Sequence, residues 1–182
     1  MDKVLRHSHR VIEEVLTKND VAIDMTMGAG NDTLVLARLA KKVYAFDIQE
    51  EALKKARETL KDFDNVEYIL DSHDNVLNYV REKVKAVIFN LGYFPGGDKS
   101  ITTKASTTLK ALEKVLSILD KKGICAICLY PGHSEGKIES EKVLEYVKGL
   151  NQKEFEVLKY EFINQINEPP FLIAIEKRWE HF

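Results

Sequence analysis

Residues 21–33 are VAIDMTMGAGNDT, a short apolar run followed by two glycines and a polar stretch. The run 21–25 predicts a buried strand, and apolar residues at helical spacing predict a helix over 31–40. Gly28 and Gly30 lack a Cβ, so the loop between strand and helix can turn tightly and approach a ligand. Unpaired N–H groups at the start of the helix could bind an anionic group such as a carboxylate.

Working outward from this stretch, apolar runs alternate with helical patterns along the chain. Helices are expected at 4–18, 31–40, 50–60, 74–82, 104–119 and 137–150, and strands at 21–25, 43–47, 66–70, 86–89, 124–130, 155–163 and 171–176. Repeated βα units predict a mostly parallel sheet with helices on both faces, and the last two strands should pair antiparallel as a hairpin. This α/β pattern resembles the Rossmann-like, seven-stranded class I methyltransferase fold, with residues 1–182 forming one domain.

Acidic residues end the second and third predicted strands. Asp47 is placed to accept hydrogen bonds from ribose hydroxyls, and Asp71 is followed by Ser72 and His73. In a doubly wound sheet these strand ends share one crevice with the glycine loop. We therefore expect one nucleoside-containing ligand to bind across all three.

A dinucleotide is the first alternative ligand. Its fingerprint requires a third glycine, and Thr33 occupies that position. Asp24 is poorly suited to a pyrophosphate but well suited to a cationic amino group, as on a methionine moiety. We therefore favour S-adenosylmethionine. Asp32 or Thr33 is expected to cap the following helix.

The segment after the fourth strand, residues 89–98, is FNLGYFPGGD. Amino-group methyltransferases carry an Asn/Asp-Pro-Pro-aromatic loop here, whose polar residue holds the target nitrogen. Asn90 and Tyr93 have that spacing, although Leu91 and Gly92 replace the prolines. The alternative is a glycine-rich turn with a core aromatic residue.

Two further polar loops follow late strands. His133 lies in the first, residues 130–136, and the second spans 164–170. Polar loops at the carboxyl edge of a sheet often carry function, although His133 could equally be an ordinary surface histidine. Cys125 and Cys128 form a CxxC motif inside an apolar strand. We expect them to pack in the core on opposite faces, and we expect no metal site.

The composition indicates which partners and which cellular compartment to expect. The 182 residues include 27 Lys+Arg and 29 Asp+Glu, for a formal charge of −2, so nucleic-acid binding would require a local basic patch. No apolar run approaches the length of a membrane span. With no secretion signal and only two cysteines, we expect a cytoplasmic protein that does not bind membranes.

Five motifs together resemble one bacterial family. They are GAGNDT, AFDIQ, FNLGYFPGGDKSITT, YPGH and NQINEPPFLIAIEK. The chain is similar, from Ser8 to Lys177, to the tRNA wobble-uridine methyltransferases formerly labelled rRNA methylases. The resemblance implies conversion of 5-aminomethyl-2-thiouridine in the tRNA anticodon to its methylaminomethyl form, with S-adenosylhomocysteine as the other product. The family usually has His where this chain has Asn31.

The sequence and the resemblance together give two sets of site residues. Those expected to bind the donor are Asp24, Thr26, Gly28, Gly30, Asn31, Asp32, Asp47, Gln49, Asp71, Ser72, His73 and Asn90. Those expected to act in catalysis are Asn90, Tyr93, Asp98 and His133. Asp98 or His133 would accept a proton from the amine, and a homodimer is compatible with the sequence. A ribosomal RNA or another amine as acceptor, and a non-catalytic RNA-binding module, are the alternatives.

Overall fold

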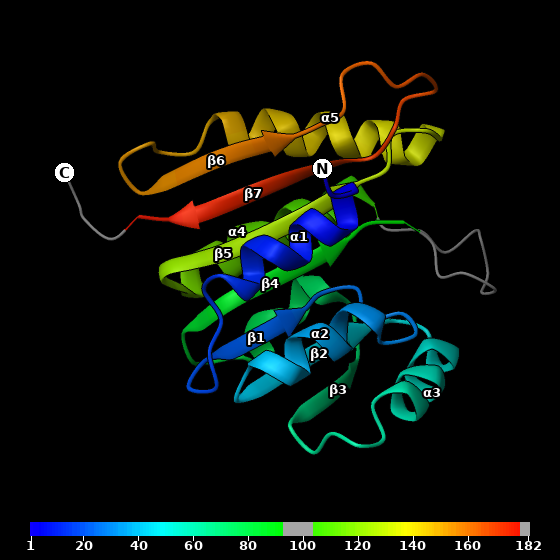
Figure 1. The fold of residues 1–182 in the computed structure, drawn as a ribbon, viewed down its shortest axis with the longest axis vertical. Helices are drawn as coiled ribbons and strands as arrows, with labels where there is room; N and C mark the ends of the chain where they lie inside the picture. Colours follow the sequence, from blue (N-terminus) through cyan, green and yellow to red (C-terminus); the bar gives the residue numbers. More distant parts are fainter. Residues whose placement is uncertain (93–103, 179–182) are drawn as a thin grey trace.

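The centre of the protein is a seven-stranded sheet, seen in a computed structural model that describes residues 1–92 and 104–178 (Figure 1). The spatial order of the strands is β3-β2-β1-β4-β5-β7-β6. The strands are β1 (Val21–Asp24), β2 (Lys42–Asp47), β3 (Val66–Leu70), β4 (Val84–Asn90), β5 (Leu119–Leu129), β6 (Phe155–Tyr160) and β7 (Phe171–Lys177). Strands β1 to β5 are parallel, and β7 is antiparallel to both β5 and β6. The predicted class I fold and its antiparallel final pair are confirmed.

The order of the strands reverses at β1, which lies between β2 and β4. Consecutive crossovers leave the sheet in opposite directions from such a point, so a crevice opens beyond the carboxyl ends of the strands. The loops after β1, β2, β3 and β4 meet there. Topology alone therefore places the candidate site.

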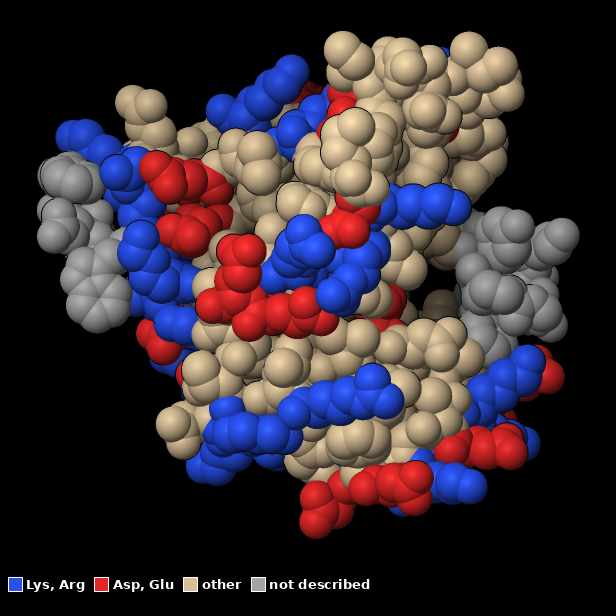
Figure 2. Space-filling model, in the orientation of Figure 1, with Lys and Arg blue, Asp and Glu red and all other residues tan. Residues whose placement is uncertain are grey.

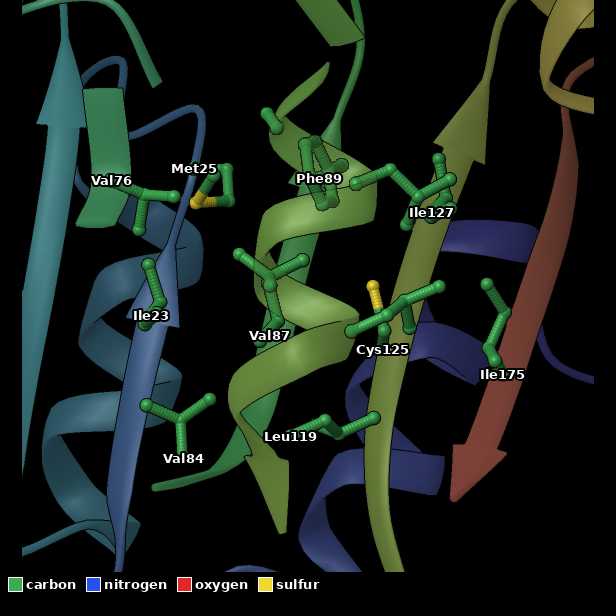
Figure 3. Close-up of a cluster of buried hydrophobic side chains, with 14 of the residues drawn as sticks. Ile23, Met25, Val76, Val84, Val87, Phe89, Leu119, Cys125, Ile127 and Ile175 are labelled. Atoms are coloured by element: carbon green, nitrogen blue, oxygen red, sulfur yellow. The ribbon is translucent and has the colours of Figure 1, made fainter. Parts of the chain in front are cut away.

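Helices cover both faces of the sheet (Figure 1). They are α1 (Val4–Glu13), α2 (Asn31–Leu39), α3 (Glu50–Thr59), the 3-10 helix η1 (His73–Asn78), α4 (Ala105–Ile118) and α5 (Ser134–Lys148). Helices α1, α2 and α3 share one apolar cluster with the sheet, and η1, α4 and α5 share another. Figure 3 shows the second cluster, in which Val76 of η1 lies near Ile23 and Met25. No helix in the described parts of the chain is long and apolar enough to cross a bilayer.

The two cysteines of β5 lie on opposite faces of the sheet. Cys125 belongs to the cluster under α4 and α5, and Cys128 to the cluster under α1 and α2. Both thiols are buried, and burial raises the pKa of each, that of Cys128 to about 12. The prediction that the CxxC motif packs in the core is confirmed.

Several boundaries differ from the sequence-based expectations for local reasons. Helix α1 ends at Glu13 rather than residue 18. The expected end of the helix is instead a turn over residues 17–20, in which the Thr17 amide and hydroxyl both donate to Asp20 Oδ2. The helix expected over 74–82 is the shorter η1. Strand β5 begins at Leu119 rather than residue 124, because Leu119 already pairs with Val84, ahead of an irregularity in the register of β4 and β5.

Candidate functional site

A cleft of about 950 Å³ lies at the carboxyl edge of the sheet, a size typical of small-ligand sites. Most predicted site residues line it, namely Thr26, Gly28, Asn31, Asp32, Asp47, Gln49, Asp71, Ser72, His73, Asn90 and His133. Asp24 and Gly30 are not among its lining residues. Tyr93 and Asp98 lie outside the described residues. The structure thus brings the predicted donor-binding and amine-binding residues Asp47 and Asn90 to one cleft.

Asp47 joins the ends of β1 and β2. Its Oδ2 accepts a hydrogen bond from the Gly28 amide at 2.9 Å, and its Oδ1 accepts one from the Gln49 amide at 3.0 Å. A carboxylate oxygen has two lone pairs, so both oxygens keep acceptor capacity toward the cleft. The tip of β2 is therefore fixed by backbone groups and still available to ligand hydroxyls.

Asp24 lies behind the cleft wall. Its carboxylate accepts the Thr33 hydroxyl at 2.7 Å and the Thr26 amide at 3.0 Å, and its side chain is fully buried. Burial, and then the nearby Asp32 carboxylate, raise the pKa of Asp24. Asp24 thus holds the loop after β1 from behind, and its expected contact with a ligand stays a prediction.

Helix α2 starts at the cleft without a side-chain cap. Its N-cap residue is Gly30, in the left-handed region at φ 88°, where a Cβ would lie 3.3 Å from Ala56 of α3. The expected capping by Asp32 or Thr33 is wrong, because both side chains bond elsewhere. The first N–H groups of α2 therefore stay available to an anionic group, next to Asn31 in the cleft wall.

The third strand end forms its own hydrogen-bonded turn. Asp71 Oδ1 accepts from the Ser72 amide and the Asn75 side chain, and Oδ2 accepts from the Tyr79 hydroxyl at 2.7 Å. These donors, the Tyr79 hydroxyl first, lower the pKa of Asp71. His73 Nδ1 lies 3.0 Å from the Met25 carbonyl, and burial lowers the pKa of this imidazole. A neutral ring at this position donates through Nδ1 and adds no charge to the cleft.

On the opposite wall, Asn90 is fixed by three partners. Its backbone amide donates to Thr26 Oγ1 at 2.7 Å, and its Nδ2 donates to Asp32 Oδ2 at 3.1 Å. The Tyr130 hydroxyl donates to Asn90 Oδ1. Sequence reasoning missed Tyr130 as a site residue. Tyr130 follows β5 directly and is the first residue of the YPGH motif, which is the feature that could have identified it.

His133 is the N-cap residue of α5. Its Nδ1 accepts the Gly136 amide at 3.2 Å, so the ring can take up a proton at Nδ1 only by releasing that amide. A Cβ on Gly136 would lie 2.0 Å from the Tyr130 carbonyl oxygen, so this turn requires glycine. Glu168, of the loop over 164–170, lies beside this turn and pairs with Lys137 at 3.5 Å.

The polar groups of the cleft fit S-adenosylmethionine. Carboxylates of Asp47 and Asp71 line it, which suits a sulfonium and an ammonium group. The start of α2 suits the methionine carboxylate, and the exposed apolar side chain of Ile48 suits an adenine ring. Away from the cleft, basic and acidic groups are interspersed on the face shown in Figure 2.

Comparison with known proteins agrees with this fit. The family described as "Putative rRNA methylase" matches residues 43–176. The chain is 34% identical to the chloroplastic tRNA (mnm(5)s(2)U34)-methyltransferase of Arabidopsis thaliana, over 97% of this chain and 70% of that protein.

Two solved bacterial structures have the same fold. A "putative methyltransferase" from Streptococcus mutans in complex with S-adenosylhomocysteine has a TM-score of 0.93 and 48% identity, covering 97% of this chain and 99% of that one. A "putative rRNA-methylase" from Clostridium thermocellum has a TM-score of 0.94 and 43% identity, covering 97% and 98%. The chain therefore belongs to this rRNA-methylase family of S-adenosylmethionine-dependent methyltransferases.

Proposed function

We propose that this methyltransferase acts on the primary amine of 5-aminomethyl-2-thiouridine at the wobble position of tRNA. The observation that carries the proposal is the position of Asn90, whose amide lies in the same cleft as Asp47. Support for the RNA acceptor comes from the similarity to the chloroplastic tRNA enzyme, which extends over 97% of this chain.

The proposed donor site follows the ends of β1, β2 and β3. Asp47 would accept ribose hydroxyls, and the uncapped start of α2 would bind the methionine carboxylate. Ser72 and Gln49 would contact the rest of the nucleoside, since both line the same cleft. When bound, S-adenosylmethionine supplies a methyl group activated by its sulfonium.

The proposed acceptor site centres on Asn90. Its Oδ1 already accepts from Tyr130 and has a second lone pair that can accept an N–H from a primary amine. Holding the nitrogen in line with the methyl group can supply roughly 7–11 kcal/mol of the barrier reduction in well-oriented systems. Tyr93 would stack on the base. We therefore assign Asn90 the role of orienting the nucleophile.

The amine must also lose a proton, because an alkyl ammonium has no lone pair with which to attack. His133 would have to give up the Gly136 amide to accept that proton at Nδ1, whereas its Nε2 can donate a hydrogen bond. Asp98 is accordingly our proposed proton acceptor, acting directly or through water.

The test is methylation of a defined tRNA. Purified protein is mixed with S-adenosylmethionine and tRNA carrying 5-aminomethyl-2-thiouridine, and the digested nucleosides are analysed by mass spectrometry. We expect the methylaminomethyl nucleoside to appear, and a tRNA with unmodified uridine at that position is the control. Methylation of ribosomal RNA or another amine instead, or no transfer to any RNA, would contradict the proposal.

A further inference from the structure

Behind Asn90, four polar side chains from distant parts of the chain form one line of hydrogen bonds. His9 of α1 contacts Asp32 of α2, with Nε2 and Oδ1 2.6 Å apart. The other oxygen of Asp32 accepts Asn90 Nδ2 at 3.1 Å, and the Tyr130 hydroxyl donates to Asn90 Oδ1. The line of hydrogen bonds thus connects His9 of α1 to the side-chain amide of Asn90, the group that we propose orients the amine.

This line fixes which way the Asn90 amide points. A carboxylate only accepts hydrogen bonds, so Asp32 must face the NH₂ group of Asn90 rather than its oxygen. The Tyr130 hydroxyl then meets the amide oxygen from the other side. Burial raises the pKa of Tyr130, which keeps its hydroxyl protonated and able to donate. One amide orientation satisfies both neighbours, and it presents an oxygen lone pair to the cleft.

His9 completes the environment of Asp32. The Asp32 side chain is only 8% exposed, and a nearly buried carboxylate needs donors on both oxygens. His9 supplies the donor on Oδ1 and thereby leaves Oδ2 to Asn90. Because Asp32 accepts, the proton of this hydrogen bond is on His9 Nε2.

We propose that His9, Asp32 and Tyr130 are positioning residues that set the direction of the Asn90 amide for the amine acceptor. This inference rests on the proposed function, because it gives these residues a role only where an amine must be held. It also gives Asp32 a role on the acceptor side of the cleft rather than in donor binding.

The test compares two substitutions of His9. His9→Leu removes the donor to Asp32, and we expect kcat to fall about 10- to 100-fold, as for a slightly misplaced reacting group. His9→Gln keeps an N–H donor near the position of Nε2, and we expect it to recover most of the lost kcat. Binding of S-adenosylhomocysteine should stay within about twofold of wild type in both, since losing a hydrogen bond that donor binding does not use changes its affinity little.

A matched control lies two residues earlier on the same helix. His7 stacks on Tyr160, with ring centroids 4.0 Å apart, and takes no part in the line to Asn90. His7→Leu should keep the wild-type kcat. The thermal midpoint of unfolding of all three variants then separates a general loss of stability from a specific loss of turnover.

A second readout does not depend on the acceptor. In the ¹⁵N NMR spectrum of the complex with S-adenosylhomocysteine, the Asn90 side-chain NH₂ should give two well-separated proton resonances. His9→Leu should bring them together, and His9→Gln should restore the separation. The proposed function fails if the wild-type protein does not methylate the modified tRNA, whereas this inference is then still decided by NMR.

Three results would overturn the inference. They are an unchanged Asn90 side-chain signal in His9→Leu, a His9→Gln variant as impaired as His9→Leu, and a loss of donor binding that matches the loss of kcat. The first removes the link from His9 to Asn90, the second removes the role of the hydrogen bond, and the third makes the effect a general structural one.

Discussion

The two halves of the cleft are built differently. On the half that we propose binds the donor, which contains Asp47 and Asp71 and is called the donor half, carboxylates bond mainly to backbone amides and hydroxyls of the adjoining loops, as Asp47 does with Gly28 and Gln49. On the half that we propose binds the amine, called the acceptor half, the Asn90 amide is held by side chains, with Asp32 58 residues and Tyr130 40 residues away in sequence. The donor half is thus set by contiguous motifs, and the acceptor half by the packing of the whole sheet.

This difference predicts separable effects of substitution. Changes on the acceptor half should reduce turnover and spare donor binding, because its contacts do not extend to the tips of β2 and β3. Changes on the donor half should weaken donor binding and spare turnover at saturating donor. A substitution that reduces turnover and donor binding equally would argue against this division of the cleft into two halves.

The largest expected effect is that of Asn90→Ala. Without the amide the amine loses its orienting acceptor, and we expect kcat to fall about 100-fold or more, as for misplaced reacting groups. Calorimetric titration with S-adenosylhomocysteine should give nearly the wild-type affinity. A collapse of that affinity would show that Asn90 serves donor binding instead.

Gly136→Ala should damage the acceptor half through backbone packing. The new Cβ would lie 2.0 Å from the Tyr130 carbonyl oxygen, and overpacking of this kind costs about 2 kcal/mol of folding free energy. Urea denaturation measures the loss. Gly149→Ala at the other end of α5 is the control, since its Cβ would have 3.4 Å to the nearest atom. Equal stabilities of the two variants would contradict the crowding argument.

Asp47→Ala tests the donor half. Loss of charge-assisted hydrogen bonds should weaken binding of S-adenosylhomocysteine about 10-fold, measured by titration. Asp47→Asn keeps one oxygen acceptor and should lose less. Unchanged affinity in Asp47→Ala would refute the proposed contact with ribose.

The smallest expected effect is a pH dependence from Asp24. Its pKa is raised to about 7 in the folded state, so the folded protein holds a proton that the unfolded chain has already released. Its contribution to stability is therefore lost as the pH rises through 7, by about 1 kcal/mol between about pH 6 and about pH 8. Urea denaturation of Asp24→Asn should lack this decline. The same decline in both proteins would assign it to other groups.

The sequence was sufficient to predict the class of sheet and most of the residues that line the cleft. Strand β3 has the expected bounds, and the alternation of strands and helices predicted a mostly parallel sheet with a final antiparallel pair, whereas the strand order came from the structure. The GAGNDT motif predicted where the loop lies. It did not predict that Gly30 is needed because the loop approaches Ala56 closely, since Ala56 belongs to α3, which the motif does not include. A sequence motif thus predicts those parts of the structure whose contacts lie within the motif itself.

The acceptor half was only partly predictable. Asn90 was found from the spacing of its loop, whereas the contacts of His9 and Tyr130 span 23 and 40 residues. Spacing along the chain says nothing about such pairs until the strands are arranged in space. The same limit explains why Asp32 was expected to cap α2, although its side chain turns to α1 and β4.

The central claim is that donor and amine meet between Asp47 and Asn90. A crystal structure of the protein with S-adenosylhomocysteine and an anticodon stem-loop carrying 5-aminomethyl-2-thiouridine tests it most directly. We predict ribose hydroxyls within hydrogen-bond distance of Asp47 and the amine nitrogen within hydrogen-bond distance of Asn90 Oδ1. An amine bound away from Asn90, or a ribose bound away from Asp47, would contradict it.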